Sequence, residues 1–237
     1  MEKHLALIVP AHNEERRIGR MLKAYFEFLA GKPKCHATII VVLNGCTDNT
    51  NEVVQQFVRP DLMVMDLKEA GKGLAIKRGF EKALELPVDL IGFVDADMAT
   101  SSDQFYQLLV HIADYDGIIK SRYMKGSKVI PPRPAIKEWG RRLVYQPLVW
   151  LLFGLRFADY QCGAKLFKRP VIEKVTLLLT VTQWAFDVEL LYLCRRFGFR
   201  IREWPTIWYD QAGSKLTVKG WFRMLGSLFI IKWRHLW

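Results

Sequence analysis

The sequence predicts an α/β fold in which a mostly parallel β-sheet is flanked by helices. Over the first half of the chain, short runs of apolar residues alternate with longer segments whose apolar residues recur at helical spacing. The short runs are apolar at nearly every position, which is typical of strands buried on both faces. Such an alternation of strands and helices is the pattern of a parallel sheet covered on both sides.

Most of these elements have local signals at their ends. The first expected strand stops at Pro10, and after the second strand a turn contains Thr47 and Asp48, either of which can cap a helix. Gly71 opens the next helix, and a Thr/Ser/Asp cluster caps the helix after the fourth strand. The expected strands are residues 5–9, 38–43, 62–65, 90–94 and 117–120, and the expected helices are residues 14–30, a helix to about residue 58, and residues 71–86 and 104–113.

Two strongly apolar segments follow, residues 143–155 and residues 221–237. Neither contains the roughly 18–20 consecutive apolar residues that a transmembrane helix needs. Each is either a helix buried in the core or an amphipathic helix lying in a membrane surface, and the tryptophans of the second segment favour the surface. The basic residues that would then meet lipid headgroups are Arg141, Arg142, Arg156, Lys219, Arg223, Lys232 and Arg234.

Composition restricts the class of protein. The chain has 237 residues, of which 51% are hydrophobic and 25% charged, so it is globular and forms one large domain or two small ones. Its formal net charge of +11 favours an anionic partner: a nucleotide, a nucleic acid or a phospholipid surface. Because no nucleic-acid-binding module is recognisable, only charge supports a nucleic acid. The cysteines lack C-x-x-C spacing, which favours reduced thiols in a cytosolic protein.

Asp95 and Asp97 directly follow the fourth expected strand. Open α/β sheets bind ligands at the carboxyl ends of their strands. Two carboxylates this close repel each other unless a cation lies between them or one is protonated. Mg²⁺ or Mn²⁺ suits such a pair, because carboxylates and phosphates are its preferred ligands. The sequence therefore predicts a divalent-metal site here, and the alternative is a helix N-cap region with spare acids.

Stretches after the other expected strands fall at the same edge of the sheet. They read Pro-Ala-His-Asn-Glu-Glu from Pro10, Leu-Asn-Gly-Cys-Thr-Asp from Leu43, Gly-Lys-Gly from Gly71 and Asp-Ala-Asp from Asp95. Together these stretches resemble the nucleotide-sugar half of glycosyltransferase family 2, which are inverting enzymes of GT-A fold.

Later stretches sharpen this resemblance, which extends over residues 5–215. They are Lys-Ser-Arg-Tyr from Lys120, Asp-Tyr-Gln-Cys-Gly-Ala-Lys-Leu-Phe from Asp159, Trp-Ala-Phe-Asp-Val-Glu-Leu-Leu from Trp184 and Gly-Ser-Lys-Leu from Gly213. They resemble the polyprenyl-phosphate branch of the family and are most similar to its dolichyl-phosphate β-glucosyltransferase type.

The resemblance implies a role for individual residues. Asp97 would be the metal ligand next to the diphosphate, and Asp95 would face the ribose and the metal. Pro10 and Glu14 would lie at the base or sugar-ring side. Gly71-Lys72-Gly73 would let the backbone approach the nucleotide, or would simply start a helix with a solvated lysine. The implied nucleotide-sugar-binding residues are Pro10, Ala11, Asn13, Glu14, Asn44, Lys72, Gly73, Asp95 and Ala96.

The resemblance also implies the acceptor, a polyprenyl (dolichyl) monophosphate. Because a lipid phosphate has a second pKa of about 6, it needs cations but no general base. Arg122 and Lys215, with Arg141 or Arg142 as weaker candidates, would hold it. Asp187 occupies the place of the base in hydroxyl-accepting relatives. It would orient sugar hydroxyls or a basic partner, or be an acid favoured at a helix N-terminus. The implied catalytic residues are Asp97, Arg122, Asp187 and Lys215.

Two positions depart from the family's pattern. Asn44 stands where an acid usually holds the base or ribose, so the choice between uracil and guanine stays open. Ala99 stands where mannosyl-type enzymes often place a metal-binding glutamine, so water or another group must fill that position.

These inferences give a domain plan and two functions. Residues 1–217 would form a GT-A catalytic domain that includes an apolar interface helix at residues 137–156, and residues 218–237 a C-terminal amphipathic helix. The protein would transfer a hexose from UDP-glucose or GDP-mannose, as a peripheral protein on the cytoplasmic face of a membrane. The alternative is a soluble family 2 enzyme that uses a saccharide hydroxyl with Asp187 as base. No oligomeric state follows from the sequence.

Overall fold

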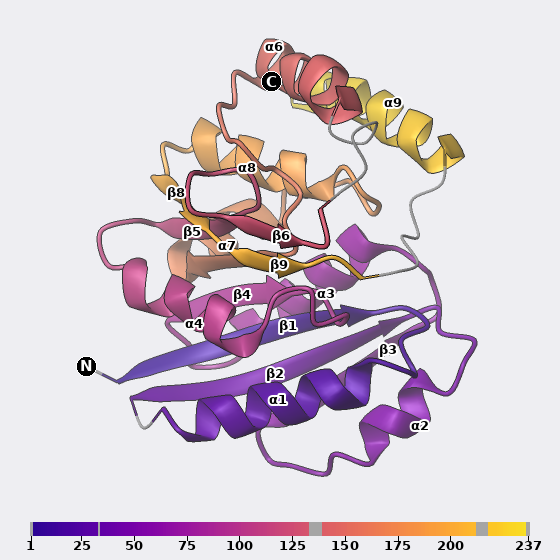
Figure 1. The fold of residues 1–237 in the computed structure, drawn as a ribbon, viewed down its shortest axis with the longest axis vertical. Coiled ribbons are helices and arrows are strands. Elements are labelled where there is room, and N and C mark those ends of the chain that lie inside the picture. Colours follow the sequence, from indigo (N-terminus) through magenta and orange to yellow (C-terminus); the bar gives the residue numbers. More distant parts are fainter. Residues whose placement is uncertain (1, 33, 133–138, 212–217, 236–237) are drawn as a thin grey trace.

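A seven-stranded sheet forms the centre of the molecule in a computed structural model, which describes residues 2–32, 34–132, 139–211 and 218–235 (Figure 1). The strand order is β3-β2-β1-β4-β7-β5-β8. Neighbouring strands are parallel, except that β7 runs antiparallel to both β4 and β5. The predicted α/β fold with a mostly parallel sheet is therefore confirmed.

The chain alternates strands and helices over its first half, as expected. The strands of the main sheet are β1 (Lys3–Ala11), β2 (Cys35–Asn44), β3 (Leu62–Leu67), β4 (Leu90–Val94), β5 (Gly117–Ser121), β7 (Ala164–Lys168) and β8 (Ile201–Pro205), and β6 (Lys128–Ile130) pairs with β9 (Ile207–Tyr209) in a small parallel sheet. The helices are α1 (Ile18–Ala30), α2 (Thr50–Gln55), α3 (Lys72–Leu84), α4 (Ser102–His111), the π-helical turn η1 (Arg141–Tyr145), α6 (Gln146–Phe153), α7 (Arg169–Thr176), α8 (Phe186–Arg196) and α9 (Val218–Arg234).

Helices cover both faces of the sheet because successive strand residues point to opposite sides. In β1, Leu5 and Leu7 belong to the apolar core beneath α1, α2 and α4, whereas Ile8 belongs to the core beneath α3, α7 and α8. Helices α6 and α9 lie side by side at one end of the molecule (Figure 1) and add apolar side chains to the second core. The sheet is thus buried on both faces.

Helix α1 begins later than the sequence predicts. Its expected start was residue 14, but residues 14–17 form a turn in which the Glu14 carbonyl accepts hydrogen bonds from the N–H groups of Arg17 and Ile18, at 2.9 Å each. Glu14 therefore precedes the helix and lies in the loop after β1.

The two apolar segments are helical, and each is buried on one side only. Val149 and Phe153 of α6 and Leu228 of α9 are in the core, whereas Leu151 and Trp233 are each 74% exposed. One side of each helix therefore belongs to the core, and contact of the exposed side with a membrane stays a prediction. Within the described ranges no helix combines the length and apolar character required to cross a bilayer.

Candidate active site

The loops after β1 and β2 are joined at the carboxyl edge of the sheet. The Asn13 carboxamide oxygen accepts a 2.8 Å hydrogen bond from the Thr47 N–H, and the Glu14 N–H donates to the Thr50 hydroxyl at 2.7 Å. Asn13 has a φ of 53°, in the left-handed region that asparagine tolerates better than most residues. These contacts place the Asn13 and Glu14 backbone at the edge where the acids after β4 also lie.

Asn44, which the sequence places at the nucleotide, makes two hydrogen bonds within the protein, and its contact with the nucleotide stays a prediction. Its Nδ2 donates to the Ala11 carbonyl at 2.8 Å, and its Oδ1 accepts from the Gly71 N–H at 3.1 Å. Asn44 is only 3% exposed. Because both ends of the amide are bonded within the protein, Asn44 ties the turn before α3 to the end of β1.

The glycines at the start of α3 permit close packing against another part of the chain. A Cβ on Gly73 would lie 2.6 Å from the Val181 carbonyl oxygen, and one on Gly71 would lie 2.7 Å from that of Thr182. The Leu74 N–H donates to the Thr182 carbonyl at 3.1 Å. This backbone contact accounts for the glycines, and an approach to the nucleotide stays a prediction.

Lys72, between these glycines, forms an ion pair with Asp95. Its Nζ lies 2.6 Å from Asp95 Oδ1, and the two side chains are 18% and 24% exposed. Burial alone would lower the pKa of Lys72, but the charges of Asp95, Asp187 and Asp97 raise it to about 12. The lysine is therefore a permanent cation beside the two acids, in contact with solvent.

Asp97 lies close to Asp95 in a partly buried loop after β4. Burial, and then the charge of Asp95, raises its pKa to about 6. Its Oδ1 accepts a 2.9 Å hydrogen bond from the N–H of Ala99. Ala99, which replaces the metal-binding glutamine of mannosyl-type enzymes, thus contacts Asp97 through its backbone. Among the described residues no three His, Cys, Asp or Glu side chains gather as a complete metal site. Two repelling carboxylates fit an ion that also binds substrate phosphates, as Mg²⁺ usually does.

Gly163 provides the seat of Asp95, which sequence reasoning did not identify. The Asp95 N–H donates to the Gly163 carbonyl at 3.0 Å. A Cβ at residue 163 would lie 1.8 Å from Asp95 Oδ2. Any larger residue at position 163 would displace this carboxylate, and the place of Gly163 in the Gln-Cys-Gly stretch was the available signal.

Arg122 and Asp159 form a buried pair next to this loop. Arg122 Nε and Nη2 donate to the two Asp159 oxygens at 2.6 and 2.8 Å, and the Arg122 N–H adds a 3.1 Å bond. Burial would raise the pKa of Asp159, but the Arg122 charge and hydrogen bonds hold it below its usual value. The structure thus gives Arg122 a protein partner, and its contact with an acceptor phosphate stays a prediction.

Asp187 has a basic partner, Lys165, near the start of β7. Lys165 Nζ lies 2.5 Å from Asp187 Oδ1 and donates to the Cys162 carbonyl at 2.7 Å. Lys165 is fully buried and Asp187 is 3% exposed. The expectation of a basic partner for Asp187 agrees with this contact.

The other expected acceptor cations lie near the loop that leads into β7 or outside the described residues. Arg141 donates to the Ala158 carbonyl at 3.2 Å, and its guanidinium lies 3.4 Å from the centre of the Tyr123 ring. Lys215 falls outside the described residues. The role of both at an acceptor stays a prediction.

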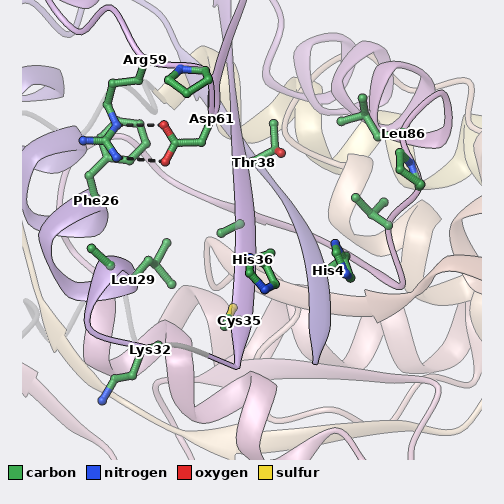
Figure 2. Close-up of a pocket in the computed structure, with 15 residues that line it drawn as sticks. His4, Phe26, Leu29, Lys32, Cys35, His36, Thr38, Arg59, Asp61 and Leu86 are labelled. Atoms are coloured by element: carbon green, nitrogen blue, oxygen red, sulfur yellow. Dashed lines mark hydrogen bonds and ion pairs between the residues drawn. The ribbon is translucent and has the colours of Figure 1, made fainter. Parts of the chain in front are cut away.

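A cavity of about 520 Å³ lies at the opposite edge of the sheet. Figure 2 shows His4 and Cys35, where β1 and β2 begin, on its wall, together with the ion pair of Arg59 and Asp61. It is therefore separated from Asp95 and Asp97 by the length of the strands.

The chain belongs to glycosyltransferase family 2. The model of the family described as Glycosyl transferase family 2 matches residues 6–176, more than half of the chain. The protein is therefore a glycosyltransferase, which confirms the family and the enzyme class that the motifs predicted.

Its similar relatives include dolichyl-phosphate β-glucosyltransferases. The enzyme of Drosophila melanogaster is 35% identical, with 98% of this chain and 75% of the relative covered. The human enzyme is 31% identical, with 99% and 76% covered. Among solved structures, glucosyl-3-phosphoglycerate synthase of Mycobacterium tuberculosis, in complex with Mn²⁺, UDP and phosphoglyceric acid, has a TM-score of 0.69 at 16% identity. That likeness covers 97% of this chain and 77% of the synthase, and confirms the GT-A-like fold.

Proposed function

We propose that this enzyme transfers glucose from UDP-glucose to dolichyl phosphate, or to a similar polyprenyl monophosphate, at a membrane surface. The dolichyl-phosphate β-glucosyltransferases among its relatives support the sugar and the acceptor. The fold neighbours that bind UDP with Mn²⁺ or Mg²⁺ support the choice of nucleotide and metal.

The pairing of Asp187 with Lys165 carries the choice of acceptor. A hydroxyl acceptor needs a base that takes its proton, and Asp187 is the residue in that position. Here the Asp187 carboxylate is buried, and its Oδ1 is already paired with the Lys165 ammonium group 2.5 Å away, so this oxygen does not face an incoming hydroxyl. An acceptor that arrives ionised, such as a phosphate monoester, needs no base. The alternative of a saccharide hydroxyl acceptor is less well supported for the same reason.

The donor side supplies positive charge for the diphosphate. In this proposal Asp97 and Asp95 hold Mg²⁺ or Mn²⁺, which offsets charge on the leaving nucleoside diphosphate when it is bound. Lys72 can turn from Asp95 to a phosphate oxygen, because the ion pair is in contact with solvent. Asn13 and Glu14 lie at the same edge for contacts with the nucleoside or sugar. The protein itself therefore contributes two anions for the metal and one cation for the phosphates.

On the acceptor side, basic residues surround the loop that leads into β7, where we place the acceptor phosphate. Arg122 is neutralised by Asp159 and orders the loop that leads into β7, whereas Arg141 packs on Tyr123 beside that loop. In this proposal Arg141 and Lys215 contact the acceptor phosphate, and Arg122 sets the position of the surrounding backbone. An Arg–phosphate contact would be charge-assisted and can be bidentate.

A membrane would contact the exposed side of η1, α6 and α9. Half or more of each of several large apolar side chains there is exposed, namely Trp139, Leu143, Trp150, Leu151, Phe229 and Trp233. Exposed arginines, among them Arg142, Arg156, Arg223 and Arg234, lie along the same segments. An apolar surface rimmed by cations suits a bilayer interface with anionic lipids. The exposed residues named above fall within the ranges 137–156 and 218–237 that the domain plan gives to the interface helix and the C-terminal helix.

The transfer reaction tests the proposal directly. With UDP-glucose, dolichyl phosphate and Mn²⁺, we expect product that disappears with EDTA, and Asp97→Asn should lower the rate at least about a hundredfold. Asp114→Asn, at an exposed acid in a loop, is the matched control and should keep full activity. Full activity of Asp97→Asn in EDTA would remove the metal site. Transfer to dolichol or a free saccharide, but not to dolichyl phosphate, would reverse the choice of acceptor.

Flotation with anionic liposomes tests the membrane surface. The full chain should float at low salt and be partly released as salt rises, because the headgroup contacts are screened. A Leu151→Glu/Trp233→Glu variant should stay in the soluble fraction, whereas Val58→Glu, at a residue 92% exposed on another part of the molecule, should float. If the unmodified chain does not float, the lipid acceptor loses its main physical support.

A further inference from the structure

Glu189, in the first turn of α8, is a fully buried carboxylate that joins two distant segments. Its Oε2 accepts hydrogen bonds from the N–H groups of Thr180 and Val181 at 2.9 and 2.8 Å. Its Oε1 accepts from the Thr180 hydroxyl at 2.6 Å and lies 2.8 Å from Nε2 of His235. An ionised carboxylate only accepts hydrogen bonds, so the Nε2–H tautomer of His235 supplies the fourth donor to Glu189.

The segment that Glu189 holds packs against the turn at the start of α3, which carries Lys72. Residues 180–183 lie against the start of α3, where Gly73 has no space for a Cβ beside the Val181 carbonyl. The Leu74 N–H donates to the Thr182 carbonyl at 3.1 Å, and Gln183 Nε2 donates to the Ala70 carbonyl at 3.1 Å. These bonds fix the backbone on both sides of Lys72, the partner of Asp95.

His235 connects the same carboxylate to the C-terminal helix. It directly follows α9, and only 9% of it is exposed. Its carbonyl accepts a 2.6 Å hydrogen bond from Arg196 Nη1. Leu228 and Ile231 of α9 are fully buried, whereas Phe229 and Trp233 are exposed. The residue at the end of α9 is thus hydrogen-bonded to Glu189, while another side of the helix is exposed.

We propose that Glu189 and His235 are positioning residues that make donor binding depend on the seating of α9. This inference rests on the proposed function, in which Lys72 and Asp95 bind the donor. If His235 leaves, Glu189 loses a donor and stays buried and charged, which is costly enough to loosen residues 180–183. The turn that carries Lys72 then loses the segment that packs against it. By linkage, bound donor holds α9 more firmly in place.

Three variants of the full chain test the coupling. His235→Ala removes the contact, His235→Gln keeps an N–H donor of similar reach, and Ser227→Ala is the control, since its hydroxyl donates to the Arg223 carbonyl of the same helix. We expect His235→Ala to raise the Kd for UDP with Mn²⁺ and the KM for the donor about tenfold, with kcat changed less than twofold. Hydrogen exchange at the Thr180 and Val181 amides should accelerate in the same variant. His235→Gln should restore most of the affinity, and Ser227→Ala should match the unmodified chain.

Several results would overturn the inference. These are an unchanged Kd and unchanged exchange in His235→Ala, an equal loss in His235→Gln, or a lower kcat at constant KM. If His235→Ala does not fold, Thr180→Val removes one donor to Glu189 without touching α9 and must show the same rise in donor KM. If the unmodified chain does not bind UDP, the proposed function fails, and exchange at Thr180 and Val181 still decides whether α9 holds the segment.

Discussion

The donor side and the acceptor side of the site use ion pairs of nearly the same length but of very different burial. Lys72 and Asp95 lie 2.6 Å apart with side chains 18% and 24% exposed. Arg122 and Asp159 also lie 2.6 Å apart, but their side chains are 7% and 2% exposed. Lys165 and Asp187 are 2.5 Å apart and 0% and 5% exposed.

This difference separates charges that can exchange partners from charges that cannot. A solvent-accessible pair contributes little to stability, so Lys72 and Asp95 can part when a ligand brings its own phosphate and metal. A buried pair cannot part without leaving an uncompensated charge in a low-dielectric region. The ion pair on the donor side can therefore exchange partners. The buried pairs Arg122–Asp159 and Lys165–Asp187 cannot, and together they form a fixed frame around the loop that leads into β7.

Breaking the frame should have the largest effect. Arg122→Ala leaves Asp159 buried without its partner and should lower the free energy of unfolding by about 3–5 kcal/mol, measured by urea denaturation. The matched control is Arg59→Ala, because Arg59 and Asp61 form an ion pair that is 43% and 35% exposed, and its loss should cost less than about 1 kcal/mol. Equal costs for the two variants would contradict the comparison.

Filling the seat of Asp95 should have the next largest effect. A methyl group in Gly163→Ala would occupy the space of the Asp95 carboxylate, so transfer should fall about a hundredfold through a misplaced acid. Gly140→Ala is the control, since nothing lies within 4 Å of an added Cβ there. Wild-type rates for Gly163→Ala would show that Asp95 does not need this position.

Lys120, a buried lysine two residues before Arg122, allows a test of burial on the acceptor side by varying the pH. It is fully buried and donates to neutral groups, Gln107 Oε1 at 2.7 Å and the Pro205 carbonyl at 2.9 Å. Burial lowers its pKa from 10.5 to about 8. Between these values the unfolded chain binds more protons than the folded one, so stability should rise with pH. Relative to Lys120→Met, the native chain should gain about 1–3 kcal/mol from pH 8 to pH 10.5 in denaturation experiments. A constant difference would refute the shift.

Removing the exchangeable cation should affect binding more than stability. Lys72→Met should weaken binding of UDP with Mn²⁺ about tenfold, while the free energy of unfolding changes by less than about 1 kcal/mol. Lys68→Met, at an exposed lysine just before the same turn, should change neither quantity. A large loss of stability in Lys72→Met would place this pair with the buried frame.

The donor edge could be predicted from the sequence because its geometry follows from strand ends. Parallel strands bring their carboxyl ends together, so residues after β1, β2, β3 and β4 must be neighbours. The sequence alone therefore places Asn44, Lys72, Asp95 and Asp97 at one edge of the sheet. The hydrogen bonds of Asn44 to Ala11 and Gly71 could not be predicted, because a buried amide and a ligand-binding amide have the same sequence signal.

The frame could not be predicted, because its partners are far apart in the chain and carry no periodic signal. Asp159 meets Arg122 only because β7 inserts between β4 and β5 in the antiparallel direction. With two lysines in five residues, β7 does not have the apolar pattern of a central strand. The position of Gly163 beneath Asp95 depends on the same insertion.

The late insertion of β7 also determines when β4 stops being an edge strand. All five residues of β4 are buried, and one of its neighbours in the finished sheet is β7. Until the ribosome has delivered residues 164–168, an apolar strand has an open row of backbone donors and acceptors, which can pair with any other extended chain. A nascent or shortened polypeptide that stops before β7 therefore exposes one edge of β4, which is prone to pair with other chains. Protection of that edge by chaperones should matter most while this stretch is being translated.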